Sequence, residues 1–184
     1  MADCPKYGLK FKFFIRDGVG RDIYYKYGVY AEDFITEHLL KDLDLKDGDL
    51  VIDIGSNIGW YSLVLSARAR PTVLSFEPDP LNFSLLEHNI QINGRQNIQS
   101  FNLAVDKEES VKTLYLYKSY NLGRHSFIPH EKSTGSVEVN TVVLDTFLQE
   151  VGFGGKPVKF LKIDIEGYEY PALLGAEKTL RNTS

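Results

Sequence analysis

The sequence predicts an α/β domain with a doubly wound, mostly parallel sheet, preceded by a β-hairpin extension. Three observations predict this fold. From residue 50 onward, short apolar runs alternate with amphipathic stretches, which is the order of strands and helices in a parallel sheet. Residues 50–54 are apolar except at Asp53, as in a strand buried on both faces. A turn with glycine at 55 and 59 follows this strand directly.

The first 44 residues form the extension, and the main domain covers residues 45–184. Apolar and basic residues alternate over 9–13, which predicts a strand. A turn at Asp17-Gly18 and a second strand over 22–25 would complete a β-hairpin. Residues 31–43 follow and carry apolar side chains at helical spacing, so they predict an amphipathic helix.

The tyrosines of the extension have two readings. They either line a lid over a substrate or pack within the extension, and the sequence does not choose between these roles. The side chains concerned are Tyr24, Tyr25, Tyr27 and Tyr30.

The main domain alternates strands and helices to its end. Predicted strands cover 50–54, 73–76, 97–105, 111–117, 137–143 and 158–163, and predicted helices cover 59–69, 80–93, 144–151 and 171–180. The chain stops soon after the last helix, which leaves an open sheet edge beyond the strand over 158–163. Truncation of C-terminal strands is the favoured explanation. A partner, a homo-oligomer formed through this edge, or coverage by the N-terminal hairpin are the alternatives.

Composition narrows the classes of function. The net charge is -4 over 184 residues, which argues against nucleic acid as an obligatory partner. Residues 1–30 differ, with six Lys or Arg against three Asp, a local charge of +3. Cys4 is the only cysteine, so no intrachain disulfide is expected. It lies near a terminus that we expect to be flexible. No apolar run is long enough to span a membrane, and we expect a cytoplasmic protein.

The strongest local signal joins the glycine turn to an acidic residue. Asp53 ends the first buried strand, and Glu77 lies 24 residues further on, at the end of the next strand. A carboxylate at that place accepts the two hydroxyls of a ribose. The helix after the turn offers backbone N–H groups to an anionic group such as a carboxylate. This order of strand, turn, helix, strand and acid indicates a cofactor that contains adenosine.

The glycine spacing selects among such cofactors. A dinucleotide fingerprint needs G-x-G-x-x-G, but Asn57 stands at its second glycine. No G-K-[ST] follows, so a P-loop is excluded. S-adenosylmethionine (SAM) has no phosphates and fits better.

At this point the sequence resembles a known family. The resemblance rests on five motifs: V-I-D-I-G-S-N-I-G (51–59), F-E-P-D-P (76–80), N-L-A-V (102–105), L-K-I-D-I-E-G-Y-E (161–169) and L-L-G-A (173–176). Together they resemble the FkbM-type methyltransferases over roughly residues 45–180. The resemblance implies a Rossmann-like class I SAM-dependent enzyme that methylates hydroxyl groups of small molecules, sugars or lipids.

The resemblance also implies roles for particular residues. The methionine end of SAM would be held by Asp53, Gly55, Ser56, Asn57 and Gly59. Glu77 with Pro78 would hold the ribose, and the segment from Asn102 to Ala104 would lie near the adenine. Asp164 and Glu166 would orient or deprotonate the acceptor hydroxyl.

Each of these carboxylates also has a plainer reading. Asp53 could cap the turn, Glu77 could begin a helix, and Asp164 and Glu166 could join Lys162 in a structural ion-pair network. A divalent cation on Asp164 and Glu166 is an alternative that we do not favour, and we predict no metal site. His125, in the loop before residue 137, is a further candidate base.

Three other functions remain as rivals. A nicotinamide-dependent oxidoreductase would use the same fold, and the missing middle glycine weighs against it. A non-catalytic nucleotide-binding or interaction module is the second rival, because fold alone does not establish function. Methylation of RNA is the third, and the absence of a basic stripe weighs against it. The expected partner is a small-molecule hydroxyl acceptor.

Overall fold

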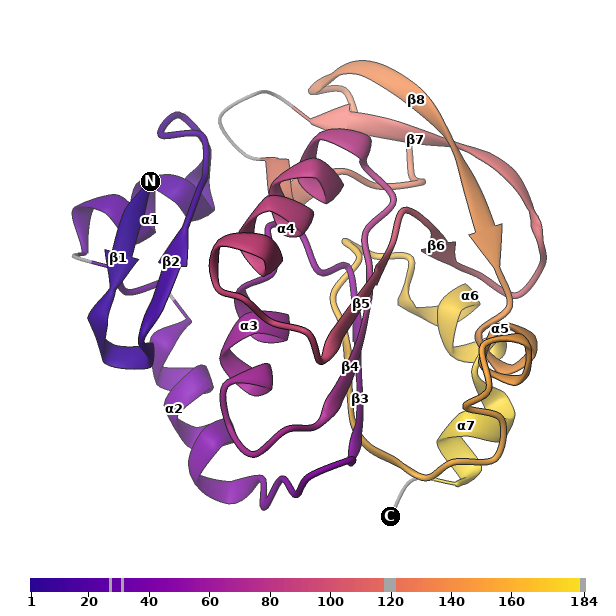
Figure 1. Ribbon diagram of the computed structural model, residues 1–184. Helices are drawn as coiled ribbons and strands as arrows, with labels where there is room; N and C mark the ends of the chain where they lie inside the picture. Colours follow the sequence, from indigo (N-terminus) through magenta and orange to yellow (C-terminus); the bar gives the residue numbers. More distant parts are fainter. Residues whose placement is uncertain (27, 31, 118–121, 183–184) are drawn as a thin grey trace.

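The computed structural model describes residues 1–26, 28–30, 32–117 and 122–182. Four parallel strands form the central sheet in the order β5-β4-β3-β9 (Figure 1). These strands are β3 (Leu50–Ile54), β4 (Thr72–Phe76), β5 (Ile98–Phe101) and β9 (Val158–Ile163). The central strand β3 is buried at every residue, as its nearly continuous apolar sequence requires. The predicted parallel α/β fold is confirmed.

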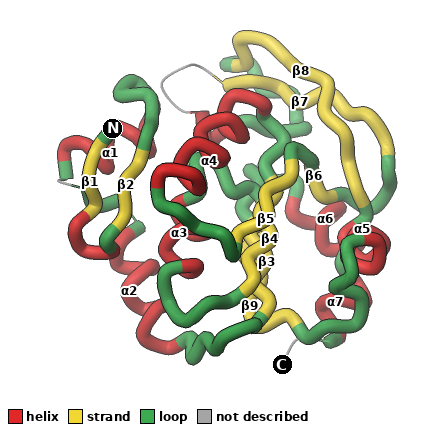
Figure 2. The backbone as a smooth tube through the Cα atoms, viewed as in Figure 1, coloured by secondary structure: helices red, strands yellow, loops and turns green. Residues whose placement is uncertain are grey.

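Helices cover both faces of this sheet (Figure 2). One face carries α3 (Trp60–Ser66) and α4 (Pro80–Ile92), and the other carries α5 (Leu144–Glu150), α6 (Glu169–Leu174) and α7 (Glu177–Arg181). Alternate residues of β3 serve the two faces. Val51 packs with the α3 side and Ile52 with the α5 side, as strand alternation dictates.

The predicted helix over 171–180 is two helices, α6 and α7. Gly175 lies between them, and a Cβ there would overlap the carbonyl oxygen of Asp106. The break between α6 and α7 therefore lies where Gly175 packs against the backbone of Asp106.

A second sheet lies beyond the end of the first. Its order is β6-β8-β7, with β6 (Ala104–Val105), β7 (Ser110–Tyr117) and β8 (Ser133–Val142). The strand predicted over 97–105 is wrong as one element, because its two halves belong to different sheets. Asn102, between them, donates its side-chain amide to the carbonyl oxygens of Glu77 and Pro78, at 2.9 Å each.

The N-terminal hairpin exists, and one of its strands lies within the predicted range 9–13, but the other strand is not the predicted one. β1 (Ala2–Cys4) pairs with β2 (Leu9–Phe11). The strand predicted over 22–25 is wrong, because these residues belong to helix α1 (Gly18–Tyr25). Asp17 caps this helix and accepts the N–H groups of Val19 and Gly20 at 3.1 and 3.3 Å. The expected turn residue is thus an N-cap.

Helix α2 (Asp33–Asp42) lies within the predicted range, but its apolar stripe is only half correct. Leu39 and Leu40 pack against the core, whereas Phe34 and Ile35 are exposed. Within the described residues, no helix is long and apolar enough to cross a membrane.

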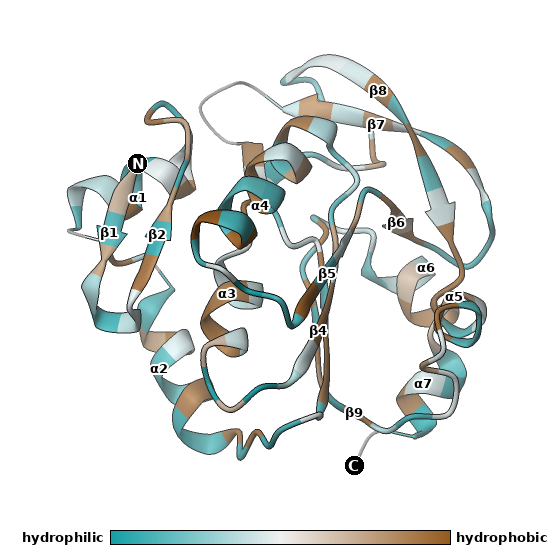
Figure 3. Ribbon diagram, in the orientation of Figure 1, coloured by the Kyte–Doolittle hydropathy of each residue, from teal (hydrophilic) through white to brown (hydrophobic). Residues whose placement is uncertain are grey.

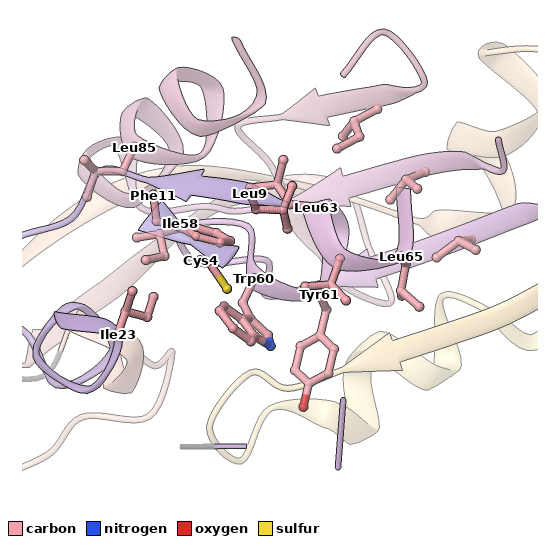
Figure 4. Close-up of a cluster of buried hydrophobic side chains, with 14 residues drawn as sticks. Cys4, Leu9, Phe11, Ile23, Ile58, Trp60, Tyr61, Leu63, Leu65 and Leu85 are labelled. Atoms are coloured by element: carbon pink, nitrogen blue, oxygen red, sulfur yellow. The ribbon is translucent and has the colours of Figure 1, made fainter. Parts of the chain in front are cut away.

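The extension shares a hydrophobic core with the main domain (Figure 4). The Trp60 ring stacks on Phe11 with centroids 5.3 Å apart, and it contacts Tyr7 and Tyr30 at 5.7 and 5.4 Å. Cys4 is fully buried in this core, so the expectation of a flexible terminus there is wrong. The hairpin forms its own sheet on the α3 and α4 side, so it does not cover the free side of β9.

Candidate functional site

A cavity of about 510 Å³ opens at the carboxyl ends of β3, β4 and β9. This is the edge at which parallel α/β sheets bind ligands, and the volume suits a small-molecule site. Nine of the predicted site residues line it: Gly55, Ser56, Asn57, Glu77, Pro78, Ala104, His125, Asp164 and Glu166. Asp53, Gly59 and Asn102 are not among its lining residues.

The glycine turn is shaped first by the protein itself. Gly55 has φ +77°, and a Cβ there would overlap the carbonyl oxygen of Asp164. Gly59 has φ +91°, and its Cβ would lie 2.6 Å from a methyl group of Leu86. Both positions therefore need glycine before any ligand arrives. The turn and the Asp164 segment form adjoining walls of one cavity.

Asn57 lies in this turn with an unsatisfied acceptor. Its backbone adopts φ +50°, a left-handed conformation that is uncommon outside glycine. Its side-chain Oδ1 is buried without a hydrogen-bond partner among the described residues, and so is Oδ1 of Asn82, which lines the same cavity. Buried acceptors of this kind are rare, and a ligand with N–H or O–H donors would satisfy them.

Glu77 lies at the end of β4 with its carboxylate buried. One oxygen accepts the N–H of Asn57 at 2.7 Å, and the other accepts the N–H of Asp79 at 3.0 Å. Burial raises the pKa of Glu77 to about 7, although the two N–H donors act in the opposite direction. The glycine turn and the β4 end are thus joined through one carboxylate.

Asp53 supports the site from behind. Its carboxylate accepts the hydroxyl of Ser62 at 2.6 Å and lies 3.3 Å from the Lys162 ammonium. Lys162 also donates to the carbonyl oxygen of Gly55 at 2.8 Å. Asp53 therefore positions Lys162, and Lys162 in turn binds the glycine turn at the Gly55 carbonyl. Lys162 itself lines the cavity.

Asp164 and Glu166 follow β9 and reach the same cavity. The Asp164 side chain is 61% exposed and lies 3.9 Å from Lys162. Glu166 has φ +54°, and its carboxylate lies 3.9 Å from Arg124. Burial, with a smaller effect from Asp164, raises the pKa of Glu166. A strained backbone at a carboxylate with a raised pKa is typical of functional sites.

His125 is held on both sides of its ring. Nδ1 accepts the N–H of Tyr117 at 2.9 Å, and Nε2 lies 3.7 Å from the Asp79 carboxylate. Burial lowers its pKa, while Asp79 and Asp17 oppose that shift. This geometry favours a residue that braces the loop over the cavity. A catalytic role for His125 stays a prediction.

The extension contributes a wall that the sequence did not single out. Glu32 lines the cavity and accepts the hydroxyl of Tyr61 at 2.6 Å. Tyr30 also lines it, whereas Tyr24 and Tyr25 are exposed, and Tyr27 lies outside the described residues. Tyr30 lines the cavity and also packs on Trp60, and a lid over a substrate stays a prediction. No spacing in the sequence relates Glu32 to Tyr61, so no signal could have found this pair.

The described part of the chain contains no group of three or more His, Cys, Asp or Glu side chains placed to hold a metal ion.

Known proteins resemble this chain at low identity. Methyltransferase 1 of Beauveria bassiana is 28% identical over 149 residues, which cover 71% of this chain and 59% of that protein. The hexuronic acid methyltransferase AglP of Haloferax volcanii is 29% identical, with 77% and 55% covered. The 31-O-demethyl-FK506 methyltransferase FkbM of Streptomyces tacrolimicus is 28% identical, with 81% and 68% covered.

The chain thus spans between 55% and 68% of the length of these relatives. A family model described as the methyltransferase FkbM domain matches residues 53–183. This range includes the glycine turn, Glu77 and the Asp164 segment, all of which line the cavity. The chain belongs to the FkbM methyltransferase domain family.

Proposed function

We propose that this chain is a SAM-dependent methyltransferase of the cytoplasm that methylates a hydroxyl group of a small molecule, sugar or lipid. One observation carries the cofactor assignment. The buried Glu77 carboxylate accepts the backbone N–H of Asn57, whose side-chain Oδ1 has no hydrogen-bond partner among the described residues, and both residues line the cavity. An acceptor pair of this kind suits a ribose and an ammonium group.

The residues present fit SAM along the length of the cavity. Glu77 would accept the ribose hydroxyls, and Asn57 would accept a donor of the methionine end. Leu103 and Ala104 line the cavity beyond Pro78 and would contact the adenine. The cofactor, when bound, supplies an electrophilic methyl group on a sulfonium.

The acceptor would occupy the part of the cavity between Asp164, Glu166 and the wall of the extension. A hydroxyl is a weak nucleophile, so a nearby carboxylate that takes its proton would speed its attack on the methyl carbon. The carboxylate would take the hydroxyl proton while the hydroxyl oxygen bonds to the methyl carbon, and the electron pair of the broken carbon–sulfur bond would stay on the sulfur. We assign this role to Asp164 or Glu166, because both nitrogens of His125 already face protein groups.

The names of two relatives support the class of acceptor. One is a hexuronic acid methyltransferase, and another acts on an O-demethylated compound, according to its name. A hydroxylated acceptor is part of our proposal for this chain on those grounds.

Calorimetric titration of SAM into the purified chain tests the cofactor. We expect saturable binding that Glu77→Ala weakens by roughly 100-fold, since two hydrogen bonds to a charged group are lost. Glu87→Ala is the matched control, because Glu87 is an exposed carboxylate that accepts the Ser100 hydroxyl and does not line the cavity. NAD serves as the competing ligand. Binding of NAD and not SAM would overturn the proposal in favour of an oxidoreductase.

The acceptor is tested separately, by methyl transfer from labelled SAM to a panel of sugars, hydroxylated lipids and RNA. We expect label in a hydroxylated small molecule. SAM binding with label only in RNA would refute the acceptor class, and SAM binding without transfer to any acceptor would favour the non-catalytic module.

A further inference from the structure

Four large side chains with apolar surface are exposed on one segment of the extension. Phe14 and Ile15 belong to the loop between β2 and α1, and Tyr24 and Tyr25 belong to the outer side of α1. Their exposed fractions lie between 44% and 68%. The loop forms an arch past the end of the hairpin, and hydrophobic and hydrophilic colours alternate along it (Figure 3). Such a group of side chains is unusual on a surface that contacts only water.

The same segment carries exposed positive charges. Lys12, Arg16 and Arg21 are exposed, and within the described part of the chain none of them forms an ion pair. Lys26 is paired only with Asp22, at 3.5 Å. Asp17, the other acidic residue here, is buried and faces the N–H groups of α1. The positive charge is therefore free to meet an anionic surface, although the whole chain carries -4.

The loop and the helix form one rigid unit. A Cβ on Gly20 of α1 would overlap the carbonyl oxygen of Phe14 and the Phe13 ring, so the loop lies directly against the helix. Asp17 fixes the junction by capping α1 and by accepting the N–H of Leu122 at 2.7 Å. The exposed side chains are thus held out on an ordered surface.

We propose that this aromatic–basic face, residues 12–26, binds the surface of an anionic lipid bilayer. Phe14 and Ile15 would enter the boundary between headgroups and acyl chains, as the apolar side chains of interfacial segments do. Tyr24 and Tyr25 would lie at the level of the headgroups, which tyrosine favours. Lys12, Arg16 and Arg21 would attract the anionic lipids.

A bilayer fits this face better than a nucleic acid does. Single-stranded nucleic acids stack their bases on free aromatic faces. The rings of Tyr24 and Tyr25 meet edge to face, at 85° and 5.3 Å, so one ring covers a face of the other. The aliphatic side chain of Ile15 has no counterpart in base stacking but suits lipid.

Co-sedimentation with vesicles tests the proposal. The full chain is mixed with vesicles of phosphatidylcholine alone or with phosphatidylserine added. We expect sedimentation with the anionic vesicles only, and weaker binding at higher salt because the attraction is screened. The double variant Arg16→Glu, Arg21→Glu should bind roughly tenfold less tightly or worse. Phe14→Ser with Ile15→Ser should also release the protein from anionic vesicles.

The control is Phe34→Ser with Ile35→Ser. These two side chains of α2 are at least as exposed, at 70% and 54%, but they lie between the acidic residues Asp33 and Glu37. The control variant should bind like the original chain, and circular dichroism should show all variants folded. Absence of binding to anionic vesicles, equal binding by the loop variants, or binding to single-stranded RNA in place of vesicles would overturn the proposal.

Discussion

Two walls of the same cavity are built in different ways. The cofactor wall, which is the wall that we propose for the cofactor, consists of the glycine turn and Glu77. The left-handed backbone of Gly55 and Gly59 shapes it, and its main-chain groups are bound by Glu77 and Lys162. The extension wall consists of Tyr30 and Glu32, and side-chain contacts over long sequence distances hold it, such as Tyr61 to Glu32 over 29 residues. From this difference we expect substitutions that alter the backbone to disturb the cofactor wall most, and substitutions that remove side-chain contacts to disturb the extension wall most.

The largest effect should come from Gly55→Ala. The new Cβ would overlap the Asp164 carbonyl in a left-handed backbone, and together these costs amount to about 4 kcal/mol of stability. Gly94→Ala is the matched control, with φ +60° but open space around the Cβ, and should cost only about 1 kcal/mol. Chemical denaturation measures both. Equal losses would show that backbone strain alone, without the close approach, explains Gly55.

The second effect is the pH dependence that Glu77 imposes. Its pKa is about 7 in the folded chain, against an ordinary 4.5. The folded state therefore keeps a proton that the unfolded state releases, so stability falls as pH rises from about 4.5 to about 7. The shift corresponds to about 3 kcal/mol. In Glu77→Gln the decline should be smaller by that amount in unfolding experiments across this range, and an unchanged pH profile would contradict the assignment.

The third effect concerns a buried side chain of the extension outside both walls. Asp17→Ala removes the cap of α1 and the contact to Leu122 N–H, and should cost about 2 kcal/mol. Asp22→Ala, which removes only a 3.5 Å ion pair with Lys26, should cost less than about 0.5 kcal/mol. Urea denaturation compares them. Similar losses would mean that the cap and the Leu122 contact of Asp17 contribute no more stability than an exposed ion pair.

The smallest effect should be the pH dependence of His125. Burial lowers its pKa below the ordinary 6.5, so the unfolded state takes up a proton that the folded state does not. Stability should therefore fall as pH drops below 6.5, and His125→Gln should reduce that fall. His38→Gln removes an exposed histidine as the control. An NMR titration that gives His125 a pKa above 6.5 would contradict the prediction.

The same contrast explains what the sequence could predict. The parallel sheet and the cofactor wall were predictable because a buried apolar strand and a left-handed glycine are local requirements. The helix α1 was missed because Asp17-Gly18 has the same composition in a turn as in a cap. Glu32 and Asn82 were missed because each reaches the cavity through tertiary packing. Asp53 was predicted to hold the cofactor, and this role stays a prediction. Its side chain contacts Ser62 and Lys162 and does not line the cavity, which strand alternation alone does not reveal.

Trp60 gives the protein a built-in optical reporter, because it is the only tryptophan in the chain. Its ring contacts Tyr7, Phe11 and Tyr30 of the extension, and its indole N–H donates to Thr36 at 3.0 Å. It also lines the cavity. Intrinsic fluorescence therefore arises at the seam between extension and main domain. Separation of the extension would shift the emission to longer wavelength, and a ligand entering beside the indole would change its intensity.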